Sequence, residues 1–338
     1  MAELTVSILG LDRLGVSIAL RLKTYMNNGG QHQFKIVGYD NRDDYEKPAR
    51  KQSAIDKIER KPFDAVRDAD VVVMNLPYED IKSGYELLKD DLRDGVVILD
   101  TSVLKQPSLA WAKQYLTEEH HVIGFTPIIN SAYMLDASLK TEDASDDYFH
   151  NSTIYLTPSV SSIKEAIDLA VNFAIILDAT PHFLDPAEHD SQTTITESIP
   201  EVMSVVAYYN AMKRNAWQDT QRLTNPPFNV LTRYLLTHHP DALRDSWLEN
   251  SENLTRAIDE IITTLTAVRD RIAEKDTAGI EAFLIEASDD YQTWINKRNT
   301  DTWEEKPNTD LKVETSITGN LFGSSISKRL FGNKNDKN

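Results

Sequence analysis

The feature that most constrains the fold is an ordered series of strand, glycine turn, helix, strand and acid at the start of the chain. Residues 4–9 form a short β-rich run, and GLDRLG follows at 10–15. Helical apolar spacing begins at residue 16, and a second strand at 34–40 ends in Asp40, 25 residues after Gly15. This is the order of a dinucleotide-binding βαβ unit, whose acid binds the ribose 2′-hydroxyl. Asp40 therefore favours NAD over NADP, although Arg42 softens that preference.

The glycine turn departs from the pattern G-x-G-x-x-G at one position. Asp12 stands where the middle glycine is expected. That glycine lets the backbone approach a pyrophosphate, so a carboxylate there adds bulk and negative charge near a helix amino terminus. We expect Arg13 to offset this charge by pairing with Asp12. The alternative is a Rossmann-like fold that no longer binds nucleotide tightly.

The alternation of strands and helices continues to about residue 184. Strands are expected at 68–77, 95–102, 120–127, 152–158 and 180–184, and helices at 78–92, 106–116 and 161–176. This alternation predicts an α/β fold with a Rossmann-like, doubly wound, mostly parallel sheet. The carboxyl ends of the strands then converge on one rim, where ligands bind. The residues expected to bind the cofactor are Gly10, Leu11, Asp12, Arg13, Leu14, Gly15, Asp40, Asn75, Leu76, Pro77 and Asp100.

The second half of the chain is strongly helical. Helices are expected at 186–214, with an interruption at Pro200, and at 228–237, 241–273 and 277–298. We therefore expect three parts: a dinucleotide-binding domain at 1–184, an all-helical domain at 185–299 and a disordered tail at 300–338. Long apolar helix faces often form dimer interfaces, so we expect a homodimer through the helical domain. The alternative is a monomer whose helices pack only on each other.

The composition argues against several classes of protein. The chain of 338 residues has a formal net charge of −17, which repels phosphate backbones, so we expect no nucleic-acid partner. It contains no cysteine, which excludes disulfides and thiolate chemistry. The eight histidines are scattered or adjacent, a poor arrangement for chelation, and we expect no metal. Without a signal peptide or a long apolar run, the expectation is a cytoplasmic protein that does not bind membranes.

Several segments together resemble the prephenate and arogenate dehydrogenases of tyrosine biosynthesis. In order, over residues 4–298, they are ILGLDRLGVSIAL, IVGYD, DADVVVMNLP, LDTSVLK, VIGFTPIIN, LDPAEHD, ESIP, and AWQDTQRL followed by RDSWLENSENL. The resemblance implies NAD-dependent oxidative decarboxylation of prephenate, or the corresponding reaction of arogenate.

The resemblance also assigns roles to particular residues. The family's D-x-x-S-x-K run falls on Asp100, Ser102 and Lys105, which places Ser102 near the nicotinamide and the substrate hydroxyl and Lys105 near the substrate. Asp219 and Arg222 are retained in WQDTQR, where the family has an R-D-x-x-R-like turn. Arg222 is expected to grip a substrate carboxylate, because a guanidinium can do so bidentately.

Two departures affect the expected chemistry. Thr126 stands in TP where the family has a catalytic histidine, and a threonine hydroxyl does not accept a proton near pH 7. His189, in the retained EHD segment, is the best substitute base by sequence, although it could instead cap or pair structurally. Glu201 replaces a family histidine and is electrostatically unfavourable near a dianionic substrate.

Two functions therefore stay open. The first is a working NAD-dependent dehydrogenase that uses another base. The second is a non-catalytic nucleotide- or metabolite-binding regulatory protein on a dehydrogenase scaffold. The losses at Asp12 and Thr126 favour the second function, whereas the retention of Asp40, Ser102 and Arg222 favours the first.

Overall fold

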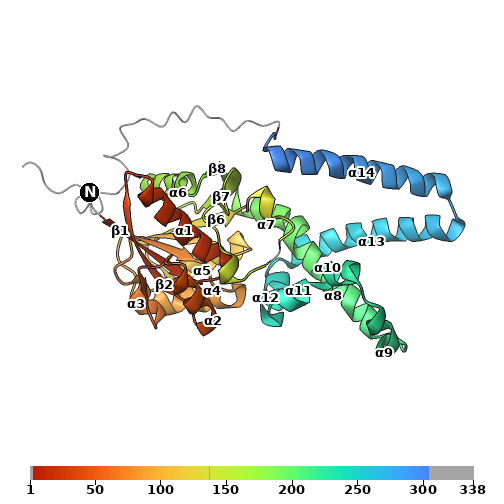
Figure 1. The fold of residues 1–338 in the computed structure, drawn as a ribbon, viewed down its shortest axis with the longest axis horizontal. Helices are drawn as coiled ribbons and strands as arrows, with labels where there is room; N and C mark the ends of the chain where they lie inside the picture. The colour runs from red at the N-terminus through yellow and green to blue at the C-terminus, as the bar shows by residue number, and fades with distance from the viewer. Residues whose placement is uncertain (1–2, 137, 304–338) are drawn as a thin grey trace, which may run out of the picture. The chain divides into compact units, whose positions relative to one another are not determined.

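The structure is a computed structural model that describes residues 3–136 and 138–303 (Figure 1). Its contacts divide the chain into two compact units, one that extends to Pro186 and one from Ala187 to Thr302. From residue 304 on, the predicted tail lies outside the described residues.

The described residues of unit 1 form eight strands and six α-helices. The strands are β1 (Glu3–Leu9), β2 (Gln33–Tyr39), β3 (Lys57–Ile58), β4 (Val71–Met74), β5 (Val97–Asp100), β6 (His121–Pro127), β7 (Ser152–Pro158) and β8 (Ala179–Phe183). The helices are α1 (Arg13–Asn27), α2 (Asp43–Lys51), α3 (Pro62–Val66), α4 (Tyr78–Leu88), α5 (Lys105–Tyr115) and α6 (Lys164–Ile176), with short 3₁₀ turns η1 (Ser131–Tyr133) and η2 (Thr141–Asp143).

The strands form one sheet in the order β3-β2-β1-β4-β5-β6-β7-β8. All neighbouring pairs are parallel except β6 and β7, which run antiparallel. The chain reverses its direction along the sheet after β3, so the ends of β1 and β4 flank the point where the strand order switches. The predicted Rossmann-like, mostly parallel sheet is confirmed.

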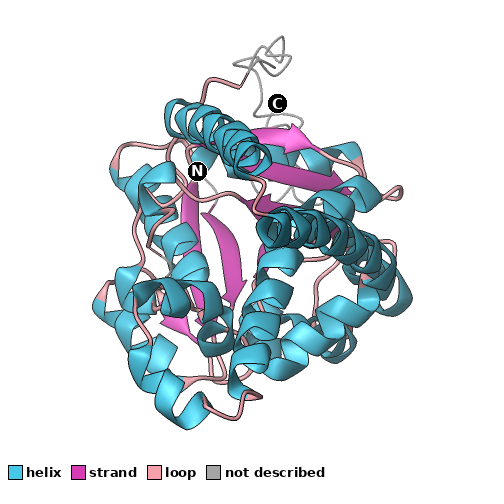
Figure 2. Ribbon diagram, turned by 90° about the vertical axis from the view of Figure 1, so that its right-hand side faces the viewer, coloured by secondary structure: helices cyan, strands magenta, loops and turns pink. Residues whose placement is uncertain are grey.

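Helices cover both faces of the sheet (Figure 2). Alternate residues of each strand point to opposite faces, so both faces carry apolar side chains that the helices bury. One face carries Val6, Ile8 and Val73 and packs against α1 and α6. The other carries Leu9, Val72 and Met74 and packs against α3, α4 and α5. Burial on two sides explains why β4 and β5 read as continuous apolar runs.

Unit 2 contains eight α-helices and two short helical turns. They are α7 (Pro186–Thr193), the π-helix η3 (Thr194–Ser198), α8 (Ile199–Met212), α9 (Trp217–Thr220), the 3₁₀ turn η4 (Gln221–Leu223), α10 (Pro226–Thr232), α11 (Tyr234–Thr237), α12 (Pro240–Glu249), α13 (Ser251–Glu274) and α14 (Thr277–Thr300).

The helices of unit 2 depart from the α-helical pattern at two informative places. A kink or interruption is predicted at Pro200, which lies in the first turn of α8; the α-helical pattern changes to the π-helix η3 just before it, while the backbone stays helical from 186 to 212. The single helix predicted at 241–273 is wrong, because the chain leaves helical geometry at Asn250 between α12 and α13. The buried Asn250 amide donates a hydrogen bond to Thr194 Oγ1 (2.7 Å). This bond to a residue distant in the sequence stabilises the break between the two helices.

Helices α13 and α14 expose large apolar side chains. No residue of α14 is buried. The exposed apolar residues of the pair are Ile262, Leu265, Ile272, Leu284, Ile285, Tyr291 and Trp294. Large apolar side chains that gather on an exposed surface mark interaction sites.

Among the described residues, no helix is long and apolar enough to cross a membrane.

Candidate functional site

The glycine turn between β1 and α1 needs both of its glycines. Gly10 has a φ of +101°, and a Cβ there would lie 1.9 Å from the carbonyl oxygen of Asn75. A Cβ on Gly15 would lie 2.1 Å from the carbonyl oxygen of Gly10. Strand β4, the turn and the first turn of α1 are therefore packed backbone against backbone, as a dinucleotide-binding turn requires.

Asp12 caps helix α1. Its Oδ1 accepts hydrogen bonds from the backbone nitrogen of Gly15 (3.0 Å) and from Nδ2 of Asn75 (2.8 Å). Thr101 Oγ1 donates to the other side of the Asn75 amide (2.9 Å). Removal from water raises the pKa of Asp12, while the hydrogen bonds from Gly15 and Asn75 act in the opposite direction. The carboxylate thus lies directly over the amino terminus of α1.

Arg13 does not pair with Asp12, and that expectation is wrong. Its Nη2 forms an ion pair with Asp136 (2.9 Å), and its Nη1 donates to the carbonyl oxygen of Ser138 (3.1 Å). The guanidinium lies 5.0 Å from the ring centroid of Tyr133 and 4.7 Å from that of Tyr148. These partners come more than a hundred residues later in the chain and bury Arg13 in the segment after β6.

Asp40 closes the turn at the end of β2. Its Oδ2 accepts a hydrogen bond from the backbone nitrogen of Leu11 (2.7 Å), and its Oδ1 accepts from Arg42 N (2.9 Å) and Nε (3.0 Å). The Arg42 guanidinium lies 4.0 Å from the ring centroid of Tyr45. The predicted acid is therefore in the expected place, with a half-buried arginine beside it.

A hollow of about 550 Å³ lies beside Asp40 at the carboxyl ends of β2 and β4. The residues that line it are Tyr39, Asn41, Pro62, Leu76, Asp80, Ser83, Gly84, Glu86, Leu87 and Leu88. It is mostly apolar in its walls, and Leu76 is one of the predicted cofactor residues. The next residue, Pro77, is the amino-terminal cap of α4, and Leu14 packs partly buried against the core.

The end of β5 carries a buried hydrogen-bond network. The Asp100 carboxylate accepts hydrogen bonds from Tyr85, from Ser108 and from the backbone nitrogen of Ser102 (2.7 Å). Burial and the nearby Asp100 raise the pKa of Tyr85 well above its usual value. The Ser102 hydroxyl donates to the carbonyl oxygen of Leu104 (3.0 Å). The buried Asp100 carboxylate therefore stabilises the conformation of the chain at the end of β5 through these hydrogen bonds.

Lys105 belongs to the same network and is fully buried. Its Nζ donates to the carbonyl oxygens of Asp100 (2.8 Å) and Ser102 (2.6 Å). A Cβ on Gly124 would lie 2.9 Å from the Lys105 side chain, so β6 packs closely on it. The sequence placed Lys105 near the substrate, whereas these contacts hold the backbone around Ser102.

Thr126 lies half-buried on β6, in register with Tyr155 on β7, which is in register with His182 on β8. Cross-strand partners project from the same face of a sheet. The rings of Tyr155 and His182 have centroids 6.0 Å apart. This row of polar side chains was missed from sequence, because only the register of three strands brings it together.

In unit 2, His189 is buried on α7 and its Nδ1 lies 2.9 Å from Oδ1 of Asp190. The carbonyl oxygen of Asp190 accepts from Thr194 Oγ1 (2.6 Å). Asp190 and Thr194 thus connect α7 to the break at Asn250, whose amide donates to both. His189 therefore occupies a constrained, oriented position.

Two carboxylates follow one helical turn apart on η3 and α8. Glu201 is buried and accepts a hydrogen bond from Trp247 Nε1 (3.1 Å). Although Glu197 keeps solvent exposure, loss of hydration raises its pKa to about 7, with a contribution from repulsion by Glu201. Loss of hydration likewise raises the pKa of Tyr234, which faces both carboxylates.

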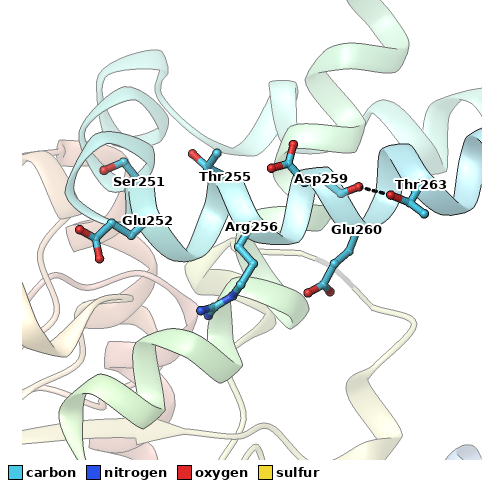
Figure 3. A pocket seen from close by; sticks show the side chains of 7 residues that line it. All are labelled: Ser251, Glu252, Thr255, Arg256, Asp259, Glu260 and Thr263. Carbon is cyan, nitrogen blue, oxygen red and sulfur yellow. Dashed lines mark hydrogen bonds between the residues drawn. The ribbon is translucent and has the colours of Figure 1, made fainter.

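Asp219 and Arg222 are exposed on α9 and η4. A separate hollow of about 650 Å³ is lined by seven residues of α13, including Arg256, Asp259 and Thr263, whose Oγ1 donates to the Asp259 carbonyl oxygen (2.9 Å) (Figure 3). All seven come from one helix, and none is a predicted site residue. Within the described residues, no cluster of histidines and carboxylates could hold a metal ion.

The sheet order, the glycine turn and the acid at the end of β2 define a Rossmann-type nucleotide-binding unit followed by a helical unit. Two family models match the chain: the nucleotide-binding domain of prephenate dehydrogenase over residues 18–180, and its dimerization domain over residues 185–286. The chain belongs to the prephenate dehydrogenase family.

Individual relatives agree with this assignment. The chain is 25% identical to a prephenate dehydrogenase of Bacillus subtilis, over 84% of this chain and 74% of the relative. It is 22% identical to a cyclohexadienyl dehydrogenase of Zymomonas mobilis, over 80% of this chain and 89% of the relative.

Solved structures share the fold. A prephenate dehydrogenase from A. aeolicus, in complex with hydroxyphenyl propionate and NAD+, superimposes with a TM-score of 0.73 at 19% identity, over 87% of this chain and 99% of that one. The arogenate dehydrogenase of Synechocystis gives a TM-score of 0.63 at 17% identity, over 86% and 100%.

Proposed function

We propose that this protein is an NAD-dependent oxidoreductase that oxidatively decarboxylates prephenate or arogenate. The observation that carries the proposal is the closed turn of unit 1, in which Asp40 accepts from Leu11 N beside two indispensable glycines, in a chain of this family. The bound NAD would supply a hydride acceptor. All further chemistry then depends on the protein's own side chains.

The residues of the turn fit a dinucleotide at its adenosine end. Asp40, which accepts from Leu11 N at the end of β2, is proposed to bind a ribose hydroxyl, and the hollow that includes Tyr39 and Leu76 is proposed to receive the adenine ring against its apolar walls. Because Gly10 and Gly15 have no side chains, the backbone at the start of α1 can be approached closely. The fit is poorest at Asp12, whose charge opposes that of a pyrophosphate.

The residues proposed to bind and orient the substrate are those at the family's motif positions. Arg222 is the proposed partner of a substrate carboxylate, with Asp219 beside it on the chain. Ser102 is proposed to orient the ring hydroxyl, and its backbone is held by Asp100 and Lys105. Lys105 is therefore proposed to act as a positioning residue.

The proton of the ring hydroxyl needs an acceptor other than Thr126. We propose His189, whose Nδ1 lies 2.9 Å from Asp190; a carboxylate at this nitrogen orients an imidazole and stabilises its protonated form. Thr126 would then form hydrogen bonds but transfer no proton.

A second function is favoured by the same two departures, Asp12 and Thr126. A non-catalytic protein that binds a nucleotide or metabolite for regulation would keep the fold and lose the base. Retention of Asp40, and of a histidine–aspartate pair in α7, favours the enzyme.

The assay follows NADH formation at 340 nm with NAD and either prephenate or arogenate, for the wild type and for Thr126→His. Turnover by the wild type that is lost in His189→Ala supports the proposed base, since removal of a general base costs about 10²–10⁴ in rate. Turnover only after Thr126→His indicates a pocket that lacks only its base. Folded protein that is silent in both forms contradicts the enzyme and favours the regulatory alternative.

A further inference from the structure

The backbone amides at the start of α1 are already engaged by acceptors of the chain itself. Leu11 N donates to Asp40 (2.7 Å), and Gly15 N donates to Asp12 (3.0 Å). Arg13 N donates to the carbonyl oxygen of Leu139 (3.3 Å). In a dinucleotide-binding turn, amides at this helix start face the anionic pyrophosphate.

The Asp12 carboxylate is held in this place from two directions. Gly15 N and Asn75 Nδ2 donate to the same oxygen, and Thr101 fixes the orientation of the Asn75 amide. The one cation in the turn, Arg13, is directed to Asp136 instead. The negative charge of Asp12 therefore meets the positive end of the α1 dipole, which is the interaction that a bound phosphate would make.

We propose that the Asp12 carboxylate stands in for the cofactor's pyrophosphate at α1 and that the dinucleotide binds in competition with it. This inference rests on the proposed binding of NAD. Two phosphates that approach α1 meet a carboxylate that already accepts from the Gly15 amide, so charge at residue 12 limits the affinity. Asp12 is not among the residues that line the hollow that includes Leu76.

Helix α14 offers a matched control. Asp276 caps it with the same geometry, since its Oδ1 accepts from the backbone nitrogen of Gly279 at 3.0 Å, three residues later. Replacement of Asp276 by asparagine removes the same charge from the same kind of cap on a helix of unit 2. Asparagine is as good a helix cap as aspartate, so Asp12→Asn removes the charge and keeps the hydrogen bonds to Gly15 and Asn75.

The test is the dissociation constant of NADH, measured by its fluorescence with wild type, Asp12→Asn, Asp12→Gly and Asp276→Asn. We expect Asp12→Asn to bind NADH about tenfold more tightly than the wild type, because one anionic repulsion at the helix start is gone. Asp12→Gly, which restores the glycine, is expected to bind more tightly as well and serves if the asparagine variant misfolds. Asp276→Asn is expected to match the wild type, and the melting temperatures of the unliganded proteins check that the cap of α1 survives.

Three results would overturn the inference. Equal NADH affinity of the wild type and both Asp12 variants would mean that Asp12 is only a helix cap, while leaving the proposed function intact. An equal gain in Asp276→Asn would mean that net charge alone is responsible. Failure of all four folded proteins to bind NADH would remove the proposed cofactor and this inference with it.

Discussion

At the scale of single residues, Lys105 illustrates how a motif position is used in this chain. Its Nζ donates hydrogen bonds to the carbonyl oxygens of Asp100 and Ser102, at 2.8 and 2.6 Å, in the fully buried network at the end of β5. A buried ammonium group is tolerated only with such partners. Lys105 is thus placed to fix the backbone of Ser102.

Lys105→Met should lower the free energy of unfolding by several kcal/mol. The substitution leaves two buried carbonyl oxygens without a donor, and each such loss costs about 1–3 kcal/mol. Urea denaturation measures the change. Lys113→Met, on the exposed side of the same helix α5, is the control and should change stability by less than about 0.5 kcal/mol. A stable Lys105→Met protein with only a raised KM would instead assign the residue to substrate binding.

At the scale of elements, the π-helix η3 and the first turn of α8 carry two neighbouring carboxylates of unit 2. Glu197 and Glu201 lie one turn apart, Trp247 donates to Glu201, and Tyr234 faces both carboxylates. Single π-helical turns inside α-helices are frequent at functional sites. The pair makes this region acidic where the family resemblance implies histidines.

Glu197 should make stability depend on pH. Its pKa in the folded protein is raised from 4.5 to about 7, so folding disfavours its charged form. Below pH 4.5 the group is neutral in both states and imposes no penalty; the penalty grows as the pH rises toward 7. We therefore expect the free energy of unfolding of Glu197→Gln, relative to wild type, to increase from pH 4.5 to 7. Urea titrations at several pH values measure it, with the exposed Glu252→Gln as control; a constant difference would contradict the shift.

The elements that could be predicted from sequence are those with a local signal. Strong apolar periodicity and the glycine turn were enough for β1, α1, β2 and the mostly parallel sheet. Helix α2 has the polar sequence DDYEKPARK with Pro48 inside it, so its periodicity is hidden, and its packed face is marked by the buried Ala49 and the partly buried Tyr45.

The details of the candidate site depended on contacts between distant residues. The residues next to Arg13 in the sequence do not indicate that Asp136 is its partner. Those next to Asn250 do not indicate that its amide bonds to Thr194. The row of Thr126, Tyr155 and His182 likewise exists only through strand register. The types of residue at the site could therefore be predicted, whereas their partners could not.

At the scale of the whole molecule, helices α13 and α14 leave an apolar surface open in a region that matches the family's dimerization domain. Leu284 and Ile285 are 58% and 54% exposed, which is costly for a helix pair that faces only water. We therefore propose that a second copy of the chain covers these helices.

The wild type should sediment as a dimer at micromolar concentration, and Leu284→Asp combined with Ile285→Asp should shift it to a monomer, because buried charges without partners oppose association. Thr293→Asp, which adds a charge at an exposed position on a different face of α14, tests whether charge on this helix is itself sufficient. A wild type that is monomeric across the concentration range of analytical ultracentrifugation would contradict the proposed dimer.

The most direct test of the whole account is a fluorescence titration of the wild-type protein with NADH and, separately, with NADPH. Asp40 accepts from Leu11 N at the position where a 2′-phosphate would meet its charge, so the account predicts tighter binding of NADH. Affinity for NADPH equal to or tighter than that for NADH would mean that Arg42 rather than Asp40 sets the preference, and it would contradict an NAD-dependent enzyme.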